Sequence, residues 1–239
     1  MKRINIPELL DTDACPPEEV SVSLRDMARI NRWFGGVSTT VELIRRVSRT
    51  AGINQLSLLE VAAGLGEVPK IAASKLSREG ITVSVTLLDR ARTHLPAGIR
   101  AVAADALALP FSDGAFDLVN CNLFAHHLEP PQLLGFVKEA LRISRFAVLV
   151  NDLVRHPLHV ALVYAAFPLM RSPVSRFDGV ASVRRSYLPE EIQQILTSIS
   201  TEPAPRVDIF RHPLFRMGIT IWKPACENHL TPSTPRPPR

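Results

Sequence analysis

Short apolar runs alternate along the chain with segments of helical spacing, and this alternation constrains the fold more than any other feature. The runs expected to form strands are residues 57–61, 82–88, 100–104, 116–121, 145–151, 206–210 and 215–222. Helices are expected over residues 24–48, 68–78, 131–142, 158–170 and 189–196. Strands that are apolar throughout are typical of a parallel sheet covered on both faces. The sequence therefore predicts an α/β fold with a Rossmann-like, doubly wound seven-stranded sheet. A short connection before the last strand predicts that this strand runs antiparallel.

Composition and the start of the chain narrow the class of protein further. With 46% hydrophobic and 21% charged residues, the chain can bury a full core. No apolar run approaches the roughly 20 residues of a membrane span, and no apolar stretch follows the N-terminus as in a secretory signal. The 3 cysteines form no Cys-x-x-Cys pair, which argues against a disulfide framework and against a zinc site. We therefore expect a cytoplasmic protein that binds no metal.

The chain is predicted to have four parts. Residues 1–23 are expected to form a flexible N-terminal arm, and residues 24–54 a helical lid segment interrupted by two glycines. Residues 55–226 are the α/β domain, with an insertion after the fifth strand at about residues 154–186. Residues 227–239 are rich in proline and are expected to be a disordered tail.

The formal net charge of +5 is concentrated in the last third of the chain, at residues 154–223. Proteins that bind nucleic acid usually carry denser stripes of lysine and arginine. The excess indicates either an ordinary solvated surface or a site for an anionic or phenolic small molecule. We expect a small-molecule substrate and no nucleic-acid partner.

The most informative motif is Glu60-Val61-Ala62-Ala63-Gly64-Leu65-Gly66, directly after the first predicted strand. Glycines in such a turn let a ligand approach the backbone, and the following helix offers free N–H groups. A nucleotide-like ligand is the first interpretation. The NAD fingerprint does not fit, because Pro69 stands where its third glycine belongs.

Acidic residues follow the next two predicted strands. Asp89 ends the second strand, where a carboxylate can accept hydrogen bonds from both hydroxyls of a ribose. Asp105 follows the third strand, and Leu-Pro-Phe-Ser-Asp-Gly-Ala-Phe-Asp-Leu-Val at residues 109–119 leads into the fourth. Together with the glycine turn, these features resemble the class I S-adenosylmethionine-dependent methyltransferases, over roughly residues 55–153.

The resemblance implies that S-adenosylmethionine is the cofactor and that residues 55–226 are a methyltransferase domain. The residues that it implies for cofactor binding follow the first four strands: Glu60, Ala62, Gly64, Gly66, Asp89, Arg90, Asp105, Ala106 and Asn122. Among these, the acid after the first strand would reach the methionine amino group, directly or through water. The acid after the second strand would bind the ribose, and the acid after the third strand the adenine. One residue departs from the family pattern, because Ala62 stands at the first glycine of the turn.

Two adjacent histidines, His126 and His127, lie between the fourth strand and the next helix, at the mouth of the site in this fold. One interpretation is a general base that takes the proton from a phenol or an acid hydroxyl, since histidine titrates near neutral pH. The other is loop packing and helix capping. Many enzymes of this class use no strong base, because proximity and alignment drive the methyl transfer.

A looser resemblance connects residues 24–36, 152–157 and 178–185 with small-molecule methyltransferases of bacterial quinone and polyketide pathways. Residues that could contact an acceptor lie in or near these segments: Trp33, Phe34, Arg155, Phe167 and Arg184. Residues 33–36 are either a mobile lid or a helix–helix corner. The apolar residues 160–170 are ordinary core, the wall of an acceptor pocket or the interface of a homodimer.

The sequence thus predicts an enzyme that transfers a methyl group from S-adenosylmethionine to an apolar aromatic or polyketide-like small molecule. A hydroxyl group is the favoured methylated position, and a carbon atom is the less favoured alternative. Two other functions stay open at this point. One is an RNA-modifying methyltransferase, and the other is a cofactor-binding protein without catalytic activity.

Overall fold

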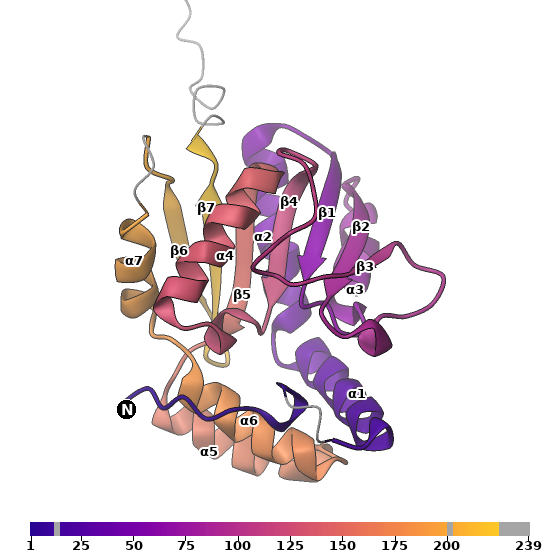
Figure 1. Ribbon diagram of the computed structural model, residues 1–239, viewed down its shortest axis with the longest axis vertical. Helices are drawn as coiled ribbons and strands as arrows, with labels where there is room; N and C mark the ends of the chain where they lie inside the picture. Colours follow the sequence, from indigo (N-terminus) through magenta and orange to yellow (C-terminus); the bar gives the residue numbers. More distant parts are fainter. Residues whose placement is uncertain (12–14, 200–202, 225–239) are drawn as a thin grey trace, which may run out of the picture.

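A seven-stranded sheet forms the centre of the structure, a computed structural model that describes residues 1–11, 15–199 and 203–224 (Figure 1). The strands follow the spatial order β3-β2-β1-β4-β5-β7-β6. They are β1 (Gln55–Val61), β2 (Thr82–Asp89), β3 (Ala101–Ala103), β4 (Phe116–Asn122), β5 (Ser144–Leu153), β6 (Val207–His212) and β7 (Arg216–Trp222). The first five strands pair in parallel, and β7 runs antiparallel to both β5 and β6. The predicted doubly wound sheet with an antiparallel last strand is confirmed.

Helices cover both faces of this sheet, as the apolar strands require. The α-helices are α1 (Pro17–Trp33), α2 (Gly36–Ala51), α3 (Glu67–Ser77), α4 (Pro130–Ile143), α5 (Pro157–Ala165), α6 (Pro173–Arg185) and α7 (Pro189–Thr197). Successive strand residues point to opposite faces, so Leu58 packs in the core under α2 and α3 while Leu59 packs in the core under α4 and α7. Both side chains are fully buried.

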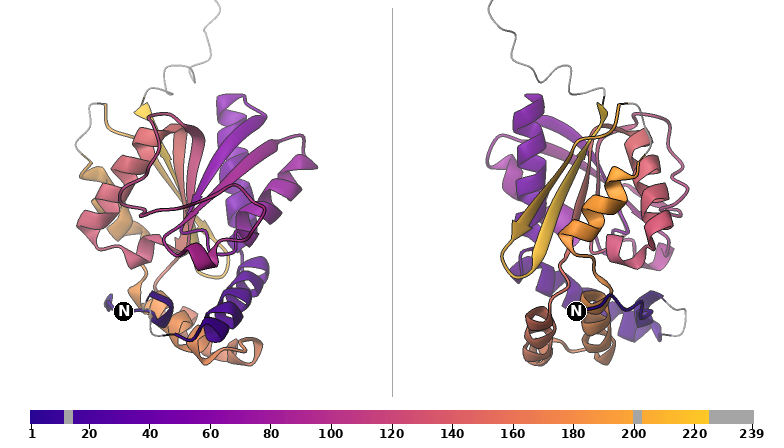
Figure 2. Two further views of the ribbon diagram at one scale, coloured as in Figure 1. Left: turned by 45° about the vertical axis from the view of Figure 1, so that its right-hand side comes forward. Right: turned by 90° about the vertical axis from the view of Figure 1, so that its left-hand side faces the viewer.

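A third group of elements lies beyond the carboxyl ends of the parallel strands. Figures 1 and 2 show α1, α5, α6 and the N-terminal segment gathered below that edge of the sheet. Four short 3₁₀ turns complete the description: η1 (Leu9–Asp11), η2 (Arg92–His94), η3 (Ala125–His127) and η4 (Phe167–Leu169). The carboxyl edge of the parallel strands is the usual place for a ligand in a doubly wound fold.

The sequence and the structure differ most in the insertion after β5. The single helix expected over residues 158–170 is divided into α5 and η4, because Pro168 cannot donate the N–H that a continuous helix needs. Helix α6 was not predicted at all. Its apolar residues follow no helical period, because it contacts α1, α5 and η1 on different sides.

The N-terminal part also differs from the expected loose arm over residues 1–23. Helix α1 already begins at Pro17, and residues 1–11 lie along α6 (Figure 1). The backbone N–H of Ile4 donates to the Arg184 carbonyl at 3.1 Å, and the N–H groups of Leu9 and Leu10 donate to the Asp178 carboxylate. The tail predicted at residues 227–239 lies outside the described residues. No helix in the described ranges is long and apolar enough to cross a membrane.

Candidate active site

The turn after β1 brings the backbone to the carboxyl edge of the sheet in a strained conformation. Ala62, Gly64 and Gly66 all have positive φ angles, of 53°, 51° and 66°. A Cβ at Gly66 would lie 2.5 Å from the Leu87 side chain, so only glycine fits there. Ala62 adopts the left-handed conformation despite its methyl group, which costs on the order of 1 kcal/mol. Strain of this kind is typical of functional turns.

Asp89 is held rigidly beside this turn at the end of β2. Its carboxylate accepts hydrogen bonds from the N–H groups of Gly64 and Ala91, each at 2.9 Å, and lies 3.4 Å from His94 Nδ1. Burial alone would raise the pKa of Asp89, but these hydrogen bonds and the histidine lower it below its ordinary value. The side chain therefore stays an anionic hydrogen-bond acceptor, and the hydrogen bond from Gly64 fixes it next to the glycine turn.

The residues predicted to bind the adenine lie at the outer rim of the site. Asp105 is exposed, and its carboxylate accepts a hydrogen bond from the Leu107 N–H at 2.8 Å. Ala106 follows it and is half-buried, and Arg90 is exposed after β2. The parallel pairing of β2 with β1 and β3 places the three strand ends side by side.

Glu60 lies near the carboxyl end of β1, in the middle of the sheet, and is fully buried. Its carboxylate accepts hydrogen bonds from the side-chain amides of two β4 residues, Asn120 at 2.6 Å and Asn122 at 2.5 Å. Burial raises the pKa of Glu60 to about 8, and the two amides offset only part of this effect. The Oδ1 atom of Asn120 is buried without a hydrogen-bond partner. The Glu60 carboxyl group and the unpaired Asn120 Oδ1 atom lie side by side, and together they are suited to a cationic ligand with N–H donors.

A chain of buried polar side chains leads from Asn122 to the corner between α1 and α2. Thr40 Oγ1 donates to Asn122 at 2.9 Å, and Asn151 donates to Thr40 at 2.9 Å. Arg216, which is 1% exposed, donates to the Asn151 side chain at 3.0 Å and also to Asn31. Sequence analysis missed all of these residues except Asn122. Only the alignment of β4, β5 and β7 brings them together.

The same arginine fixes the corner at residues 33–36. Its Nε donates to the carbonyl of Phe34 at 2.9 Å. Gly35 has a φ of +86°, and a Cβ there would lie 3.3 Å from Arg216 Cδ. A Cβ on Gly36 would approach Asn31 within 2.6 Å. The two glycines thus form a tight helix–helix corner, the second of the two interpretations of this segment. Movement of the segment as a lid stays a prediction.

His126 and His127 lie in η3, after β4, and face the N-terminal segment. His126 is 1% exposed, with its Nδ1 2.7 Å from Asp152 and its Nε2 3.1 Å from Glu8. Burial alone would lower the pKa of His126, but the two carboxylates raise it to about 10. His127 is half-buried, and its Nδ1 lies 2.9 Å from Asp11. Both imidazoles are engaged with acids, and the sequence offered no signal that Glu8 would come so close.

The residues predicted to contact an acceptor do not converge on one pocket. Trp33 is 60% exposed and lines a surface hollow of about 440 Å³ between α1 and α3. The guanidinium of Arg155 is buried and bound to Glu191, the Ser186 carbonyl and the Met1 carbonyl. Phe167 packs against Tyr164 in the α5 and η4 region. Their roles toward an acceptor stay predictions.

Phe34 and Arg184 complete the predicted acceptor set. Phe34 lies at the end of α1, in the corner held by Arg216, and Arg184 lies near the end of α6, where its carbonyl binds Ile4. Both side chains are half-buried. Helix α5 leaves an apolar strip exposed, which includes Leu158, Leu162 and Tyr164. That strip leaves both the pocket and the interface interpretation open.

Comparison with known proteins finds several that are similar to this chain. Residues 58–146 match the family described as a methyltransferase domain. The chain is 28% identical over 156 residues to a 2-methyl-6-phytyl-1,4-hydroquinone methyltransferase of Synechocystis, which covers 61% of this chain and 48% of that protein. It is 28% identical over 124 residues to a chloroplastic tocopherol O-methyltransferase of Arabidopsis thaliana, which covers 46% of this chain and 35% of that protein. The chain thus spans about half or less of these relatives.

Solved structures share the fold at low sequence identity. A plantazolicin methyltransferase in complex with S-adenosylhomocysteine superposes with a TM-score of 0.59 at 12% identity, over 87% of this chain and 96% of that chain. A methyltransferase from Aquifex aeolicus gives 0.54 at 15% identity, over 87% and 99%. Human N-acetylserotonin methyltransferase in complex with S-adenosylmethionine gives 0.57 at 13% identity, over 90% and 61%.

The sheet order, the strained turn after β1 and the acids at the carboxyl ends of β1 and β2 are typical of a nucleotide-cofactor-binding α/β domain of the doubly wound class. Within that class, residues 58–146 are similar to the family described as a methyltransferase domain, whose relatives in solved structures bind S-adenosylmethionine or S-adenosylhomocysteine. The residues present fit this cofactor. Glu60 and the orphaned Asn120 oxygen suit its cationic methionine end, and the turn at Gly64 and Gly66 carries no side chain that would keep a ligand from the backbone.

Proposed function

We propose that this protein transfers a methyl group from S-adenosylmethionine to a hydroxyl group of an apolar aromatic small molecule, with a carbon as the second choice of methylated atom. The observation that carries the proposal is the buried Glu60 carboxylate, held by Asn120 and Asn122 at the carboxyl edge of the sheet. A buried acid whose hydrogen bonds come only from neutral amides is suited to an incoming ammonium group.

Each end of the cofactor would have its own partner in this arrangement. Glu60 would bind the methionine amino group, and Asp89 would accept from the ribose hydroxyls beside the Gly64 turn. Asp105 would accept from the adenine amino group, with the Ala106 N–H directed to the ring. The sulfonium supplies an activated methyl group when the cofactor is bound. The chain's own contribution is then to align the acceptor and to exclude water.

The acceptor class is inferred from the exposed apolar residues beyond the strand ends and from the relatives. The names of the two relatives describe enzymes that methylate a phytyl hydroquinone and a tocopherol. Trp33, Phe34, Phe167 and the arginines Arg155 and Arg184 are the residues that we propose on the acceptor side, although Arg155 would first have to release Glu191. The proton of a phenol would go to His127 when Nε2 of its ring carries no other ligand, because this half-buried ring is the more accessible of the histidine pair.

Two measurements test the proposed function. Calorimetry with S-adenosylmethionine and S-adenosylhomocysteine should show one binding site, and purified protein should methylate members of a panel of alkylated phenols and hydroquinones. Cofactor binding without turnover on any of them would favour a protein without catalytic activity. Methylation of bulk RNA, with salt-dependent binding, would favour an RNA-modifying enzyme.

Phe167→Asp tests whether the α5 and η4 region lines the acceptor site. If it does, turnover should be lost while the oligomeric state, measured by light scattering, stays the same. Leu214→Asp, at an exposed turn between β6 and β7, is the matched control. A Phe167→Asp variant that changes from dimer to monomer and still methylates would show that this surface is an interface instead.

A further inference from the structure

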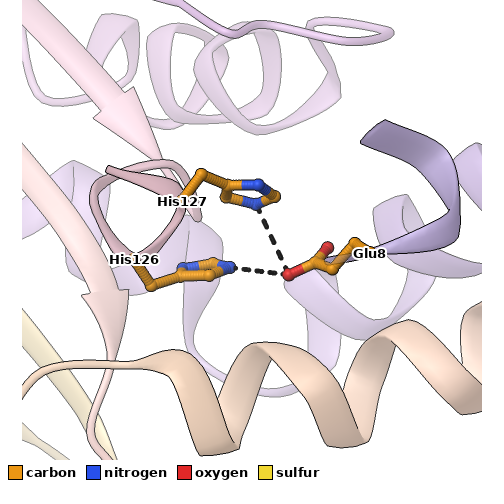
Figure 3. Close-up of side chains that lie close together, drawn as sticks. All are labelled: Glu8, His126 and His127. Carbon is orange, nitrogen blue, oxygen red and sulfur yellow. Dashed lines mark hydrogen bonds and ion pairs between the residues drawn. The ribbon is translucent and has the colours of Figure 1, made fainter. Parts of the chain in front are cut away.

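Three metal-ligating side chains meet outside the proposed cofactor site. We propose that Glu8, His126 and His127 bind a divalent transition-metal ion of the zinc type. One ligand atom from each residue lies within 4.8 Å of the other two. The Nε2 atoms of His126 and His127 lie 3.1 Å and 3.5 Å from the same oxygen, Glu8 Oε1 (Figure 3). Two rings from η3 therefore point at one carboxylate from the N-terminal segment.

The spacing of these atoms matches what a metal ion requires. Zinc binds histidine nitrogen and carboxylate oxygen at about 2.0–2.2 Å, in a tetrahedral arrangement that separates neighbouring ligand atoms by about 3.4 Å. The two distances to Glu8 Oε1 bracket this value. Two imidazoles and one carboxylate favour zinc and its transition-metal neighbours over magnesium or calcium, which prefer oxygen ligands only.

The second nitrogen of each ring is held by another acid. His126 Nδ1 lies 2.7 Å from Asp152, and His127 Nδ1 lies 2.9 Å from Asp11. Metal-binding histidines usually donate this N–H to a carboxylate, which leaves Nε2 free for the ion and fixes the ring orientation. Asp152 is itself held by the N–H groups of His126 and Leu153. Both rings therefore have the outer hydrogen bond that is typical of metal ligands.

The charge around the cluster also suits a divalent cation. Glu8, Asp11 and Asp152 contribute three carboxylates, and Arg185 contributes one guanidinium, which lies 3.1 Å from Asp11. With neutral imidazoles these groups leave two negative charges, which a divalent ion would balance.

Such an ion would join parts of the chain that are far apart in sequence. Glu8 lies next to η1, and the histidines follow β4 at the edge of the proposed active site. The ion would fasten residues 1–11 across the carboxyl ends of the strands. This contrasts with the expectation from the sequence that no metal is bound, because the spacing of Glu8 from the histidine pair follows no local metal motif.

The test is binding of Co²⁺ and Zn²⁺ to the full-length, tag-free protein after treatment with a chelator. We expect one equivalent of Co²⁺ to give visible d–d absorption bands, and Zn²⁺ to displace it. His127→Gln and Glu8→Gln should each weaken metal binding on the order of 10²-fold. Each change removes a direct ligand, and loss of a residue that only orients a ligand already weakens metal binding by about 10–100-fold. His156→Gln removes an exposed imidazole elsewhere and should leave binding unchanged.

Two controls keep the outcome interpretable. Circular dichroism of each variant without metal checks the fold, and S-adenosylmethionine affinity is measured on the same samples, so that failure of the metal site and failure of the proposed function are separate results. If His127→Gln or Glu8→Gln does not fold, the wild-type titration decides alone. Absence of Co²⁺ bands in the wild type, or equal affinity in His127→Gln and His156→Gln, overturns the proposal.

Discussion

Arg216 at the start of β7 donates a hydrogen bond to Asn31 near the end of α1, although 185 residues separate them in the chain. The guanidinium is fully buried, and its hydrogen bonds go to neutral oxygens of Asn31, Asn151 and Phe34. Burial lowers the pKa of Arg216 to about 10, so the side chain is still charged at neutral pH. One cation thereby holds the first helix, the α1–α2 corner and the middle of the sheet in one arrangement.

Replacing this arginine should therefore be strongly destabilising. Arg216→Met would leave three buried oxygens without a donor, each costing about 1–3 kcal/mol, so we expect the free energy of unfolding to fall by roughly 3 kcal/mol or more. Arg211→Met, on the neighbouring strand, removes an exposed ion pair with Glu190 and should cost less than about 1 kcal/mol. Urea unfolding followed by circular dichroism measures both. Equal losses in the two variants would contradict the role of Arg216.

Asp89→Ala and Asp105→Ala should each weaken S-adenosylmethionine binding. Loss of a hydrogen-bond acceptor leaves a ribose or adenine donor unpaired, at a cost of about 1–3 kcal/mol, which is roughly tenfold or more in affinity. The loss should be larger for Asp89, because its carboxylate also holds the Gly64 N–H. Isothermal titration calorimetry measures the affinities, with Glu18→Ala on exposed α1 as the control. Unchanged affinity in both variants would remove the cofactor assignment.

The stability of the protein should depend on pH through Glu60. Its pKa is raised to about 8 in the folded state, so the folded protein holds this proton more tightly than the unfolded chain does. The resulting stabilisation is complete below the ordinary pKa near 4.5 and is lost as the pH rises through about 8. Relative to Glu60→Gln, the wild type should lose on the order of 2–4 kcal/mol between pH 5 and pH 8. Parallel unfolding curves over this range would contradict a raised pKa.

The same group should couple cofactor binding to proton release. The cationic methionine end favours the carboxylate form of Glu60, so binding at pH 7 should release up to one proton and strengthen as the pH approaches 8. Calorimetry in buffers of different ionisation enthalpy measures the released proton. Glu60→Gln should bind more weakly and without this proton release.

Ala62→Gly should relieve the strain in the turn after β1. Ala62 has a φ of 53°, where glycine avoids the clash of a Cβ atom with the backbone. We expect the free energy of unfolding to stay the same or to rise by at most about 1 kcal/mol, because the greater freedom of the unfolded chain offsets part of the gain. Thermal unfolding measures this change. Ala63→Gly, one residue later and without a positive φ, should be destabilising by about 0.5–1 kcal/mol. The reverse order of the two variants would contradict strain at Ala62.

His127→Gln should lower turnover on the order of 10²-fold with cofactor affinity intact, because the half-buried ring of His127 is the proposed acceptor of the phenol proton. Steady-state rates over pH 6–9 with a fixed phenolic acceptor measure this effect. His156→Gln, which removes an exposed ring outside the cluster, is the control. Normal turnover in His127→Gln would contradict a role of His127 as the base.

The sequence by itself determined the order of the strands and the glycine turn after β1. Apolar runs such as residues 116–121 are typical of parallel strands that are covered on both faces. The Gly64–Gly66 turn and Asp89 each follow from residues that are close together in the sequence. These are short-range properties, so a linear pattern carries them. Helix α6 was missed because its burial follows contacts with four other elements, α1, α5, η1 and η3, and leaves no helical period in the sequence.

Only the tertiary structure decided which side chains share the carboxyl edge of the sheet. Asn120 is opposite Glu60 because β4 pairs with β1 in this register, and Glu8 reaches His126 because residues 1–11 lie along α6. Arg216 meets Asn31 because β7 enters the sheet beside β5. Contacts of this kind join residues about 60 to 185 positions apart. Their partners are set by strand register and packing, which no local spacing encodes.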